Sequence, residues 1–279
     1  MPIAPYTYPL SRATRLQLWV VVSLGSLLVA PTLFHLFAHE QAAYSVQISG
    51  ALARPSAAEW FGTDPLGRSQ WNRTLIGTAI SLRTAAGSLV LALPLSLVLG
   101  AIAGSWAGRW PDRAVSWFIA LLHTVPFFLM VVAVAALTGP GTNLLPWLIG
   151  GVIWAPAARL VRAETIRVLE SGYVRAGRAS GASPVQIFSR SLLPQITPPA
   201  TICLFYLFPE IIGIDAILTL FGLGPKPPTP SLGTLVFEGI RRWDSAPWLA
   251  GLPCVLLIII CLFIHFLADK IAAQIKQPI

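Results

Sequence analysis

The sequence predicts an all-α integral membrane protein with six transmembrane helices, on three observations. Of the 279 residues, 55% are hydrophobic and 11% are charged, whereas a soluble domain needs about a quarter of charged residues to cover its surface. The apolar residues gather in runs of the length that a helix needs to cross a bilayer, about 20 residues. Prolines interrupt most of these runs, which favours a packed bundle whose neighbouring helices satisfy the freed carbonyls, although proline is also simply common in membrane helices.

The apolar segments are six. They are Leu16–Ala38, Thr84–Trp106, Ala114–Thr138, Leu144–Leu160, Thr197–Phe221 and Ala246–Leu267. The first follows Arg12 and Arg15, as a signal peptide would, but its apolar run is longer than usual and further spans follow, which favours a retained anchor. The fourth is short and contains Pro146 and Pro156, so composition supports it least.

Positive charge predicts the orientation of the bundle. Six spans place both termini on one side, together with the segment between the fourth and fifth spans, and twelve of the 19 Lys and Arg residues fall there, against seven on the other side. Cytoplasmic loops collect Lys and Arg, so both termini are predicted to be cytoplasmic. The net charge of +8 is thereby explained without nucleic acid. Residues 1–83 form the N-terminus, first helix and external loop, and residues 84–279 a five-helix core.

A polar segment with three arginines, Gly172–Pro194, separates two apolar runs. Gly181 is suited to end a short helix, because glycine accepts the left-handed conformation at a C-terminus. Ser183 then fits the N-cap of a second helix and Pro184 its first position. The segment is therefore predicted to form two short helices joined by a turn, outside the membrane.

The second of these helices carries an apolar stripe, because Val185, Phe188 and Leu192 recur at i, i+3 and i+7. Two interpretations compete. One is an interfacial helix whose arginines meet anionic lipid, and the other is a docking element for a partner's groove. Periodicity does not decide between them.

The same segment resembles the EAA loop of ABC importer permeases, with RAGRASG in the place of EAARALG. In that family the loop forms the cytoplasmic coupling helix, between the fourth and fifth helices, that docks into the ATPase subunit. The resemblance implies a coupling loop over residues 162–195. Its coupling residues would be Arg175, Ala176, Gly177, Arg178, Gly181, Ala182, Ile187, Leu193 and Pro194.

Two further stretches are similar to C-type permease subunits of dipeptide, oligopeptide and nickel importers. GTDPLGRSQWNRTLIGTAISL (62–82) matches the family's GTDxxGRDxxSRxxxGxRxSL, and DAILTLFGLGPKPPTPSLGTL (215–235) resembles EASLSFLGLGxxPPxPSWGxM. The first could hold a ligand directly, but it is expected instead to form an external cap that orients the second span and faces the binding protein. The cap residues are Gly62, Thr63, Asp64, Gly67, Arg68 and Arg73. Asp64 and Arg68 would pair if the loop were helical. The stretch Gly222–Gly233 is expected to form a stiff external loop.

The chain departs from the family pattern at five positions. It has Arg175 for Glu, Gly177 for Ala, Ser69 for Asp, Ala79 for Arg and Ala120 for Asp. The inverted charge at Arg175 bears on the identity of the ATPase, because a charge reversal at a docking surface alters partner choice. The departures indicate a divergent member and leave the cargo open.

No phosphate-binding GxxxxGK[ST] loop, GxSxG or HExxH motif occurs. We therefore expect no catalytic residue, metal or cofactor in this chain, with ATP and Mg bound by a partner ATPase. The histidines do not cluster, and the cysteines lie in apolar runs, which disfavours a metal site. The resemblance implies a second homologous permease, two ATP-binding subunits on the coupling loop and an external solute-binding protein, in the lipid bilayer of a bacterial inner membrane.

Two acidic residues, Glu210 and Asp215, lie in or near the fifth span. A charge at the membrane centre costs about 3 kcal/mol on insertion scales, so it usually faces protein or water. Both are candidates for the translocation pathway, and Asp215 is also a candidate for a structural partner of an arginine or a backbone donor.

The predicted function is the permease subunit of an ATP-driven importer for peptides or peptide-like solutes, forming half of the pathway. One alternative is an importer of nickel or a metal–chelator complex, which uses the same subunit type. Another is an ion-coupled secondary transporter in which Glu210 or Asp215 carries a proton. An intramembrane enzyme is disfavoured, because the sequence offers no convincing pair of catalytic groups at membrane depth.

Overall fold

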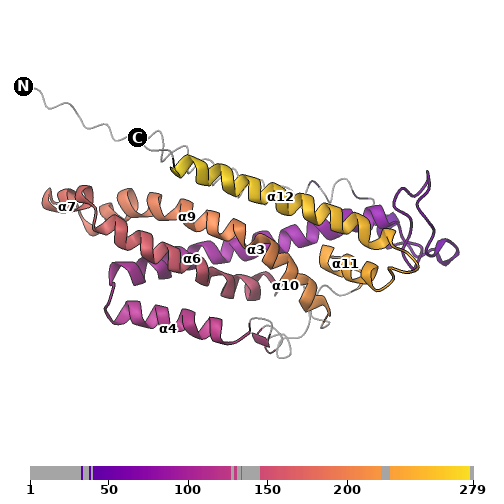
Figure 1. Ribbon diagram of the computed structural model, residues 1–279, viewed down its shortest axis with the longest axis horizontal. Helices are drawn as coiled ribbons and strands as arrows, with labels where there is room; N and C mark the ends of the chain where they lie inside the picture. Colours follow the sequence, from indigo (N-terminus) through magenta and orange to yellow (C-terminus); the bar gives the residue numbers. More distant parts are fainter. Residues whose placement is uncertain are drawn as a thin grey trace, which may run out of the picture.

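The computed structural model describes residues 40–126, 145–220 and 227–276, with the single positions 33, 38, 129, 130 and 133. Within these ranges every named element is a helix, and the pairing of strand type is one isolated bridge between Thr63 and Ser69. The long helices lie along one another in an elongated bundle (Figure 1). The all-α prediction is confirmed for this part of the chain.

The elements follow the chain in this order. They are α2 (Glu40–Tyr44), η1 (Ile48–Gly50), α3 (Gln70–Ser105), α4 (Trp110–Thr124), α6 (Leu145–Leu169), α7 (Gly172–Ala179), α8 (Pro184–Gln186), η2 (Ile187–Leu192), α9 (Leu193–Tyr206), α10 (Phe208–Leu220), α11 (Leu232–Ile240) and α12 (Trp248–Lys276). Figure 1 shows α7 at one end of the bundle, with α11 and the loop before α3 toward the opposite end.

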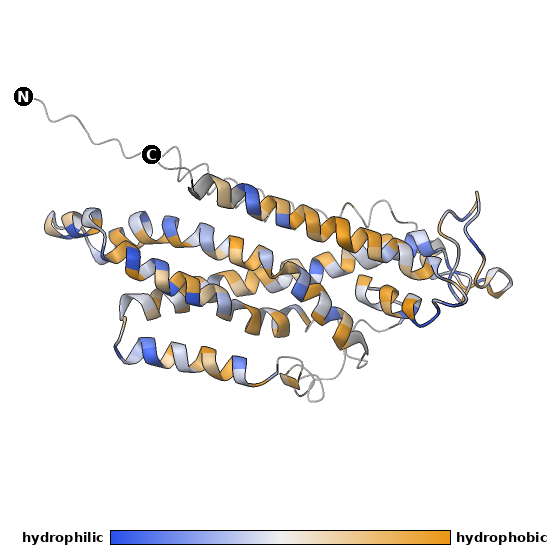
Figure 2. Cartoon of the chain, viewed as in Figure 1, coloured by the Kyte–Doolittle hydropathy of each residue, from blue (hydrophilic) through white to orange (hydrophobic). Residues whose placement is uncertain are grey.

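Two described helices are long and apolar enough to cross a membrane, Gln70–Ser105 and Trp248–Lys270. The bent pair Pro184–Tyr206 and Phe208–Leu218 adds a third when it is counted as one span. Figure 2 shows the apolar residues gathered along α12 between its ends. The α6 helix has 25 residues, but its prolines and arginines lower its apolar character.

The structure describes two of the other expected spans only in part. The first, 16–38, lies almost wholly outside the described residues, and the third passes out of them after residue 126. The total of six spans stays a prediction.

The start of the second span differs from the prediction, because α3 begins at Gln70 and not near Thr84. The added turns contain polar residues that the sequence places outside a membrane helix, yet Gln70 and Arg73 are buried. The Gln70 side-chain amide donates to the Leu249 carbonyl oxygen at 2.7 Å. Partners from other helices therefore satisfy these polar groups, and the helix extends toward the end of the bundle opposite α7 (Figure 1).

The fifth span is present as a bent pair and not as one straight helix. It breaks at Leu207 into α9 and α10, which are bent by 43° relative to each other. Pro209 is the second residue of α10. It lacks a backbone donor, and its ring clashes with the carbonyl four residues earlier, so the helix cannot pass straight through this position.

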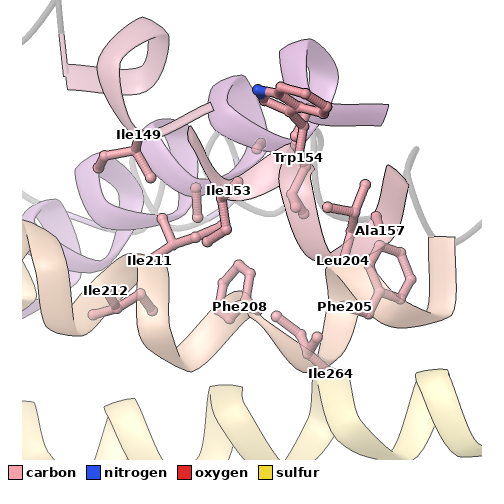
Figure 3. Close-up of a cluster of buried hydrophobic side chains, with 14 of the residues drawn as sticks. Ile149, Ile153, Trp154, Ala157, Leu204, Phe205, Phe208, Ile211, Ile212 and Ile264 are labelled. Atoms are coloured by element: carbon pink, nitrogen blue, oxygen red, sulfur yellow. The ribbon is translucent and has the colours of Figure 1, made fainter. Parts of the chain in front are cut away.

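The main hydrophobic core lies where α6 meets α3, α9, α10 and α12. Figure 3 shows Ile153 and Trp154 of α6 above Phe205 and Phe208, with Ile264 of α12 on the other side. These side chains are buried. They come from both segments of the bent pair, so the core holds the bend in place.

Glycines set the contact between α3 and α6. A Cβ atom at Gly100 would lie 2.6 Å from Cβ of Val161, and one at Gly104 would lie 2.5 Å from Cβ of Thr165. Small residues four apart let two membrane helices approach closely and gain dispersion contacts. This close approach fixes α3 against α6, the helix that leads into α7.

Candidate functional site: a helical knob and an external cap

The residues Gly172–Leu192, called here the helical knob, form α7, a turn, α8 and η2. The turn ends α7 as predicted. Gly181 has φ of +84°, its N–H donates to the Arg178 carbonyl and the Ala182 N–H donates to the Gly177 carbonyl, both at 3.0 Å. This pair of hydrogen bonds is the Schellman motif, which satisfies the free carbonyls of a helix end.

The next helix begins at the predicted residues. Ser183 is its N-cap and Pro184 its first residue. The Ser183 hydroxyl accepts from the Gln186 N–H at 3.3 Å, and the Gln186 side-chain oxygen accepts from the Ser183 N–H at 2.9 Å. This capping box satisfies two donors at once. Both helix ends that face each other across the turn are thus closed by hydrogen bonds, which makes the turn stiff.

A π-helix from Ile187 to Leu192 changes the predicted face of the second helix. The buried side chains are Ile187 and Leu192, five residues apart, while Val185 and Phe188 are 75% and 43% exposed. The predicted stripe is therefore divided, because Leu192 is buried whereas Val185 and Phe188 stay exposed. A π-turn places residues i and i+5 in line, so two apolar residues stay outside.

The knob has its own core, and this core continues into the bundle. Val174, Ile187 and Leu192 pack in one cluster with Val168 of α6 and Ile196 of α9. Their exposed fractions are between 0% and 8%. Because the cluster crosses from the knob into two long helices without a gap, a displacement of the knob must move α6 and α9 with it.

The predicted coupling residues divide into a buried and an exposed group. Ile187 is buried, and Gly177, Ala182, Leu193 and Pro194 are partly buried. Arg175, Ala176, Arg178 and Gly181 are exposed. The structure thus brings these residues together on one small body and presents its arginines to the outside.

The predicted cap residues converge on Asp64 at the other end of the bundle. One carboxylate oxygen, Oδ1, accepts from the N–H groups of Leu66 and Arg68 at 2.9 and 2.8 Å. The other, Oδ2, accepts from Nε of Arg68 at 2.7 Å and also from the Arg73 guanidinium. The expected Asp64–Arg68 pair forms, but in a loop closed by hydrogen bonds and not in a helix.

Arg73 carries this network from the loop to α11. Its guanidinium lies 3.3 Å from Oε2 of Glu238, and its side chain is 4% exposed. Thr63 contributes a second tie, because its hydroxyl donates to the Gly50 carbonyl at 2.5 Å and accepts from the Ala53 N–H. The cap residues therefore hold together α3, α11 and the loop that precedes α3.

Two cap glycines are required by the backbone. Gly62 and Gly67 have φ of +67° and +71°, a region that other residues rarely adopt. A Cβ at Gly67 would also lie 1.8 Å from the carbonyl oxygen of Gln47. The glycines of this motif are thus explained by the shape of the loop.

The sequence does not predict α11, whose first residues lie in the stretch expected to be a stiff loop. Ser231 caps it, with the Thr234 N–H donating to the Ser231 hydroxyl at 3.2 Å. Glycines let α11 pack closely against three helices. Gly77 of α3 contacts the start of α11, and Gly233 and Gly239 of α11 contact α10 and α12. These glycines are the signal in the sequence that a helix packs here.

Asp215 is buried between α10, α3 and α11. Its side chain is near the hydroxyls of Ser81 and Ser231. Each hydroxyl oxygen also accepts a backbone N–H, from Leu232 at 3.0 Å and from Thr234 at 3.2 Å, so each hydroxyl proton is available to the carboxylate. This position favours the structural role over the pathway role for Asp215.

Glu210 lies in contrasting surroundings. It is exposed in the first turn of α10, immediately after Pro209 and beside the bend. An acidic side chain within a membrane-spanning segment usually faces water or protein. The position agrees with a pathway role.

The sequence does not single out an ion pair at the base of the knob. Arg162 of α6 donates from two nitrogens to the two oxygens of Asp112 in α4, at 2.6 and 2.7 Å. These hydrogen bonds lower the pKa of Asp112 to about 2, against the effect of burial, and the Gly108 N–H adds to them. The pair joins the α3–α4 turn to the helix that carries the knob.

No group of three or more His, Cys, Asp or Glu side chains suited to a metal ion occurs among the described residues. Cys203, Cys254 and Cys261 are free thiols in a partly buried setting.

The chain is similar in sequence to curated peptide permeases. It is 32% identical over 209 residues to the dipeptide transport system permease protein DppC of Lactococcus lactis subsp. cremoris, covering 75% of this chain and 61% of that protein. It is 31% identical over 215 residues to a putative peptide transport system permease protein of Brucella suis, covering 77% and 72%. It is 29% identical over 259 residues to the oligopeptide transport system permease protein OppC of Escherichia coli K12, covering 93% and 85%.

Solved structures share the fold. The inward-facing MetNI methionine ABC transporter matches with a TM-score of 0.50 at 21% identity, over 74% of this chain and 94% of that chain. An amino acid ABC transporter matches with a TM-score of 0.54 at 13% identity, over 71% and 92%. A family model, the binding-protein-dependent transport system inner membrane component, matches residues 96–276. This match covers more than half of the chain, which therefore belongs to the family of inner membrane components of binding-protein-dependent transport systems.

Proposed function

We propose that this chain is the permease subunit of an ATP-driven importer for peptides or peptide-like solutes. The cargo class is supported by relatives that are named as dipeptide and oligopeptide permeases. In this proposal the chain crosses the membrane six times with both termini in the cytoplasm, and it forms half of the pathway beside a second, homologous permease. Two separate subunits bind ATP and Mg, and an external solute-binding protein delivers the cargo.

The observation that carries the proposal is the construction of the helical knob. Its turn is closed by the Schellman motif and the capping box, and its core is continuous with α6 and α9. A part that transmits force must not deform, and interdigitated cores deform little. The knob therefore acts as a lever that converts closure of the ATPase pair into movement of the transmembrane helices.

The bend between α9 and α10 joins the helix that leaves the knob to the other end of the bundle. The knob's cluster extends into α9 through Ile196 and Ala200, whereas α10 contacts α11 through Gly233 and, through Asp215, approaches Ser81 of α3. The two segments thus belong to opposite ends of the bundle. Because the core across the bend and the α3–α6 contact hold these helices together, alternating access follows when the whole bundle tilts with its knob against the second permease, and Glu210 lies at the bend beside the pathway.

The external cap gives the second part of the proposal. Its buried network holds the loop against α3 and α11, and it leaves aromatic residues outside, with Trp60 70% exposed and Trp243 58% exposed. Exposed aromatic side chains on a rigid support are typical of contact surfaces between proteins. We assign this surface to the solute-binding protein.

Purification of the tagged chain from native membranes in mild detergent tests the proposal. Mass spectrometry of the stoichiometric partners is expected to find an ATPase with a phosphate-binding loop and a second permease of the same family. Recovery of the chain alone, with intact solute uptake after reconstitution, would contradict the proposal and favour an ion-coupled transporter acting through Glu210 or Asp215.

A further inference from the structure

The helical knob carries positive charge that the described part of the chain does not neutralise. The segment 172–194 contains Arg175, Arg178 and Arg190 and no Asp, Glu or Lys. All three arginines are exposed, and none of their side chains makes a hydrogen bond or ion pair with the described residues. By contrast Arg167, a little earlier in α6, pairs with Glu164 at 2.6 Å. The knob therefore presents three exposed arginines that no acidic side chain among the described residues neutralises.

The two charges of α7 are held by a fixed support. Arg175 and Arg178 are one turn apart on a helix whose buried residue, Val174, is anchored in the knob's core. The carbonyls that end this helix are already satisfied by the turn, so they do not occupy the guanidinium groups. Both guanidinium groups are therefore available to a partner at a defined spacing.

Lipid headgroups are a poor match for this surface because of its distance from the membrane. The α6 helix continues nine residues past Leu160, the predicted end of its span, to Leu169, which corresponds to roughly 13 Å at 1.5 Å per residue. The headgroup region on each side is about 5–8 Å thick. A helix that binds the membrane surface instead buries its apolar face about 5–10 Å into the headgroup boundary.

The exposed apolar residues indicate a protein partner. Val185 and Phe188 leave the knob's core because of the π-helix and stay 75% and 43% exposed. Phe188 also lies nine residues before Thr197, the predicted start of the fifth span. An aromatic and an aliphatic side chain on a rigid helical body fit an apolar groove of another protein.

We propose that the partner ATPase receives the knob in a groove with acidic side chains opposite Arg175 and Arg178 and an apolar floor beneath Val185 and Phe188. This inference rests on the proposed function and adds the chemistry of the partner's surface. Opposite charges across an interface select the partner and accelerate association, while like charges exclude it. An ATPase whose groove is basic would be rejected by this knob.

The test uses the detergent-purified complex, with the tagged permease immobilised and the retained ATPase quantified as NaCl is raised. In the double variant Arg175→Glu, Arg178→Glu we expect at least about tenfold weaker retention at about 150 mM salt, because attraction becomes repulsion. Arg175→Lys, Arg178→Lys is expected to retain the ATPase, since charge is kept. The matched control, Arg241→Glu, Arg242→Glu, makes the same charge change on exposed residues of the external end and is expected to have no effect.

The outcomes separate the two proposals. ATPase release by salt and by the Glu variant, with rescue by an acidic-to-Arg change in the ATPase groove, supports the inference. An ATPase that stays bound to the Glu variant regardless of salt overturns it and leaves the proposed function intact. Binding of the knob's arginines to vesicles of anionic lipid, with no effect on ATPase retention, overturns it too. A wild-type chain that recovers no ATPase overturns both proposals.

Discussion

Replacement of Asp64 by asparagine tests whether the external cap depends on a buried charge. The side chains of Asp64 and Arg73 are 2% and 4% exposed. Asparagine keeps an oxygen that accepts the N–H groups of Leu66 and Arg68, so the turn of the loop can stay. Its amide group, however, cannot accept from the two guanidinium groups that meet at Oδ2. The substitution therefore removes the charge pairing and little else.

The cost follows from burial. Breaking a buried ion pair by removing one partner destabilises a protein by about 3–5 kcal/mol. Here Arg73 keeps a second partner, Glu238 at 3.3 Å, and Arg68 is 11% exposed, so we expect the lower value, about 3 kcal/mol. At about 2 °C per kcal/mol for a chain of this length, Tm falls by about 6 °C.

A thiol-reactive dye measures this transition without added labels. Cys203, Cys254 and Cys261 are free and partly buried, so they react as the bundle unfolds. The matched control is Glu59→Gln in the same loop, whose carboxylate accepts one hydrogen bond from the Ser69 hydroxyl at 2.8 Å, which an amide oxygen also accepts. A Tm for Asp64→Asn within a degree of wild type, or an equal fall in the control, would refute the reasoning.

Three further predictions concern the knob and its base. Gly104→Val places Cβ 2.5 Å from Thr165, so α3 and α6 must separate at a cost of about 3 kcal/mol, and a thermal transition like that of wild type contradicts the glycine contact. Hydrogen bonds from Arg162 hold the pKa of Asp112 near 2, so the stability that the ionised Asp112 contributes is present above pH 3.8 and is lost as pH falls toward 2. The difference in Tm between wild type and Asp112→Asn should therefore shrink from pH 5 to pH 2.5. A constant difference would speak against the pair. A side chain at Gly181 meets open space, but the backbone φ of +84° disfavours it. We therefore expect the complex that carries Gly181→Trp to fold and to hydrolyse ATP but to lose uptake. Normal uptake by a well-expressed variant is incompatible with the lever.

The local chemistry of the knob could be predicted because its causes are local. A glycine at the left-handed position and a Ser-Pro pair after it specify the turn whatever surrounds them, and both are found there. The face of the next helix could not be predicted in the same way. It depends on the π-helix, which shifts the register of Phe188, and no residue in the segment signals a π-helix.

The cap and α3 show why polar segments mislead. The stretch from Gln70 to Arg83 looks like a loop, because a membrane helix rarely starts with Gln, Asn and Arg. Its partners lie far away in the chain, with Leu249 and Glu238 more than 150 residues later. Local composition carries no record of these partners, so the helix start was predicted too late. The break at Leu207 is different, since Pro209 signals it in the sequence.

The family resemblance singles out the residues of the knob and the cap as candidates, whereas the pair of Asp112 and Arg162 is found only in the folded structure. Neither residue lies in RAGRASG or in the similar stretches 62–82 and 215–235, and the two are 50 positions apart. The same holds for Ser81 and Ser231 beside Asp215, two hydroxyls on different helices that no spacing rule connects.

ATP-dependent uptake in proteoliposomes tests the central claim most directly. The complex purified from native membranes is reconstituted with its solute-binding protein and a labelled peptide, and uptake is compared with that of the isolated chain in the presence of a proton gradient. The account predicts uptake by the complex that requires ATP, and none by the chain alone under either condition. Uptake by the isolated chain driven by the proton gradient, with no dependence on ATP, would contradict it.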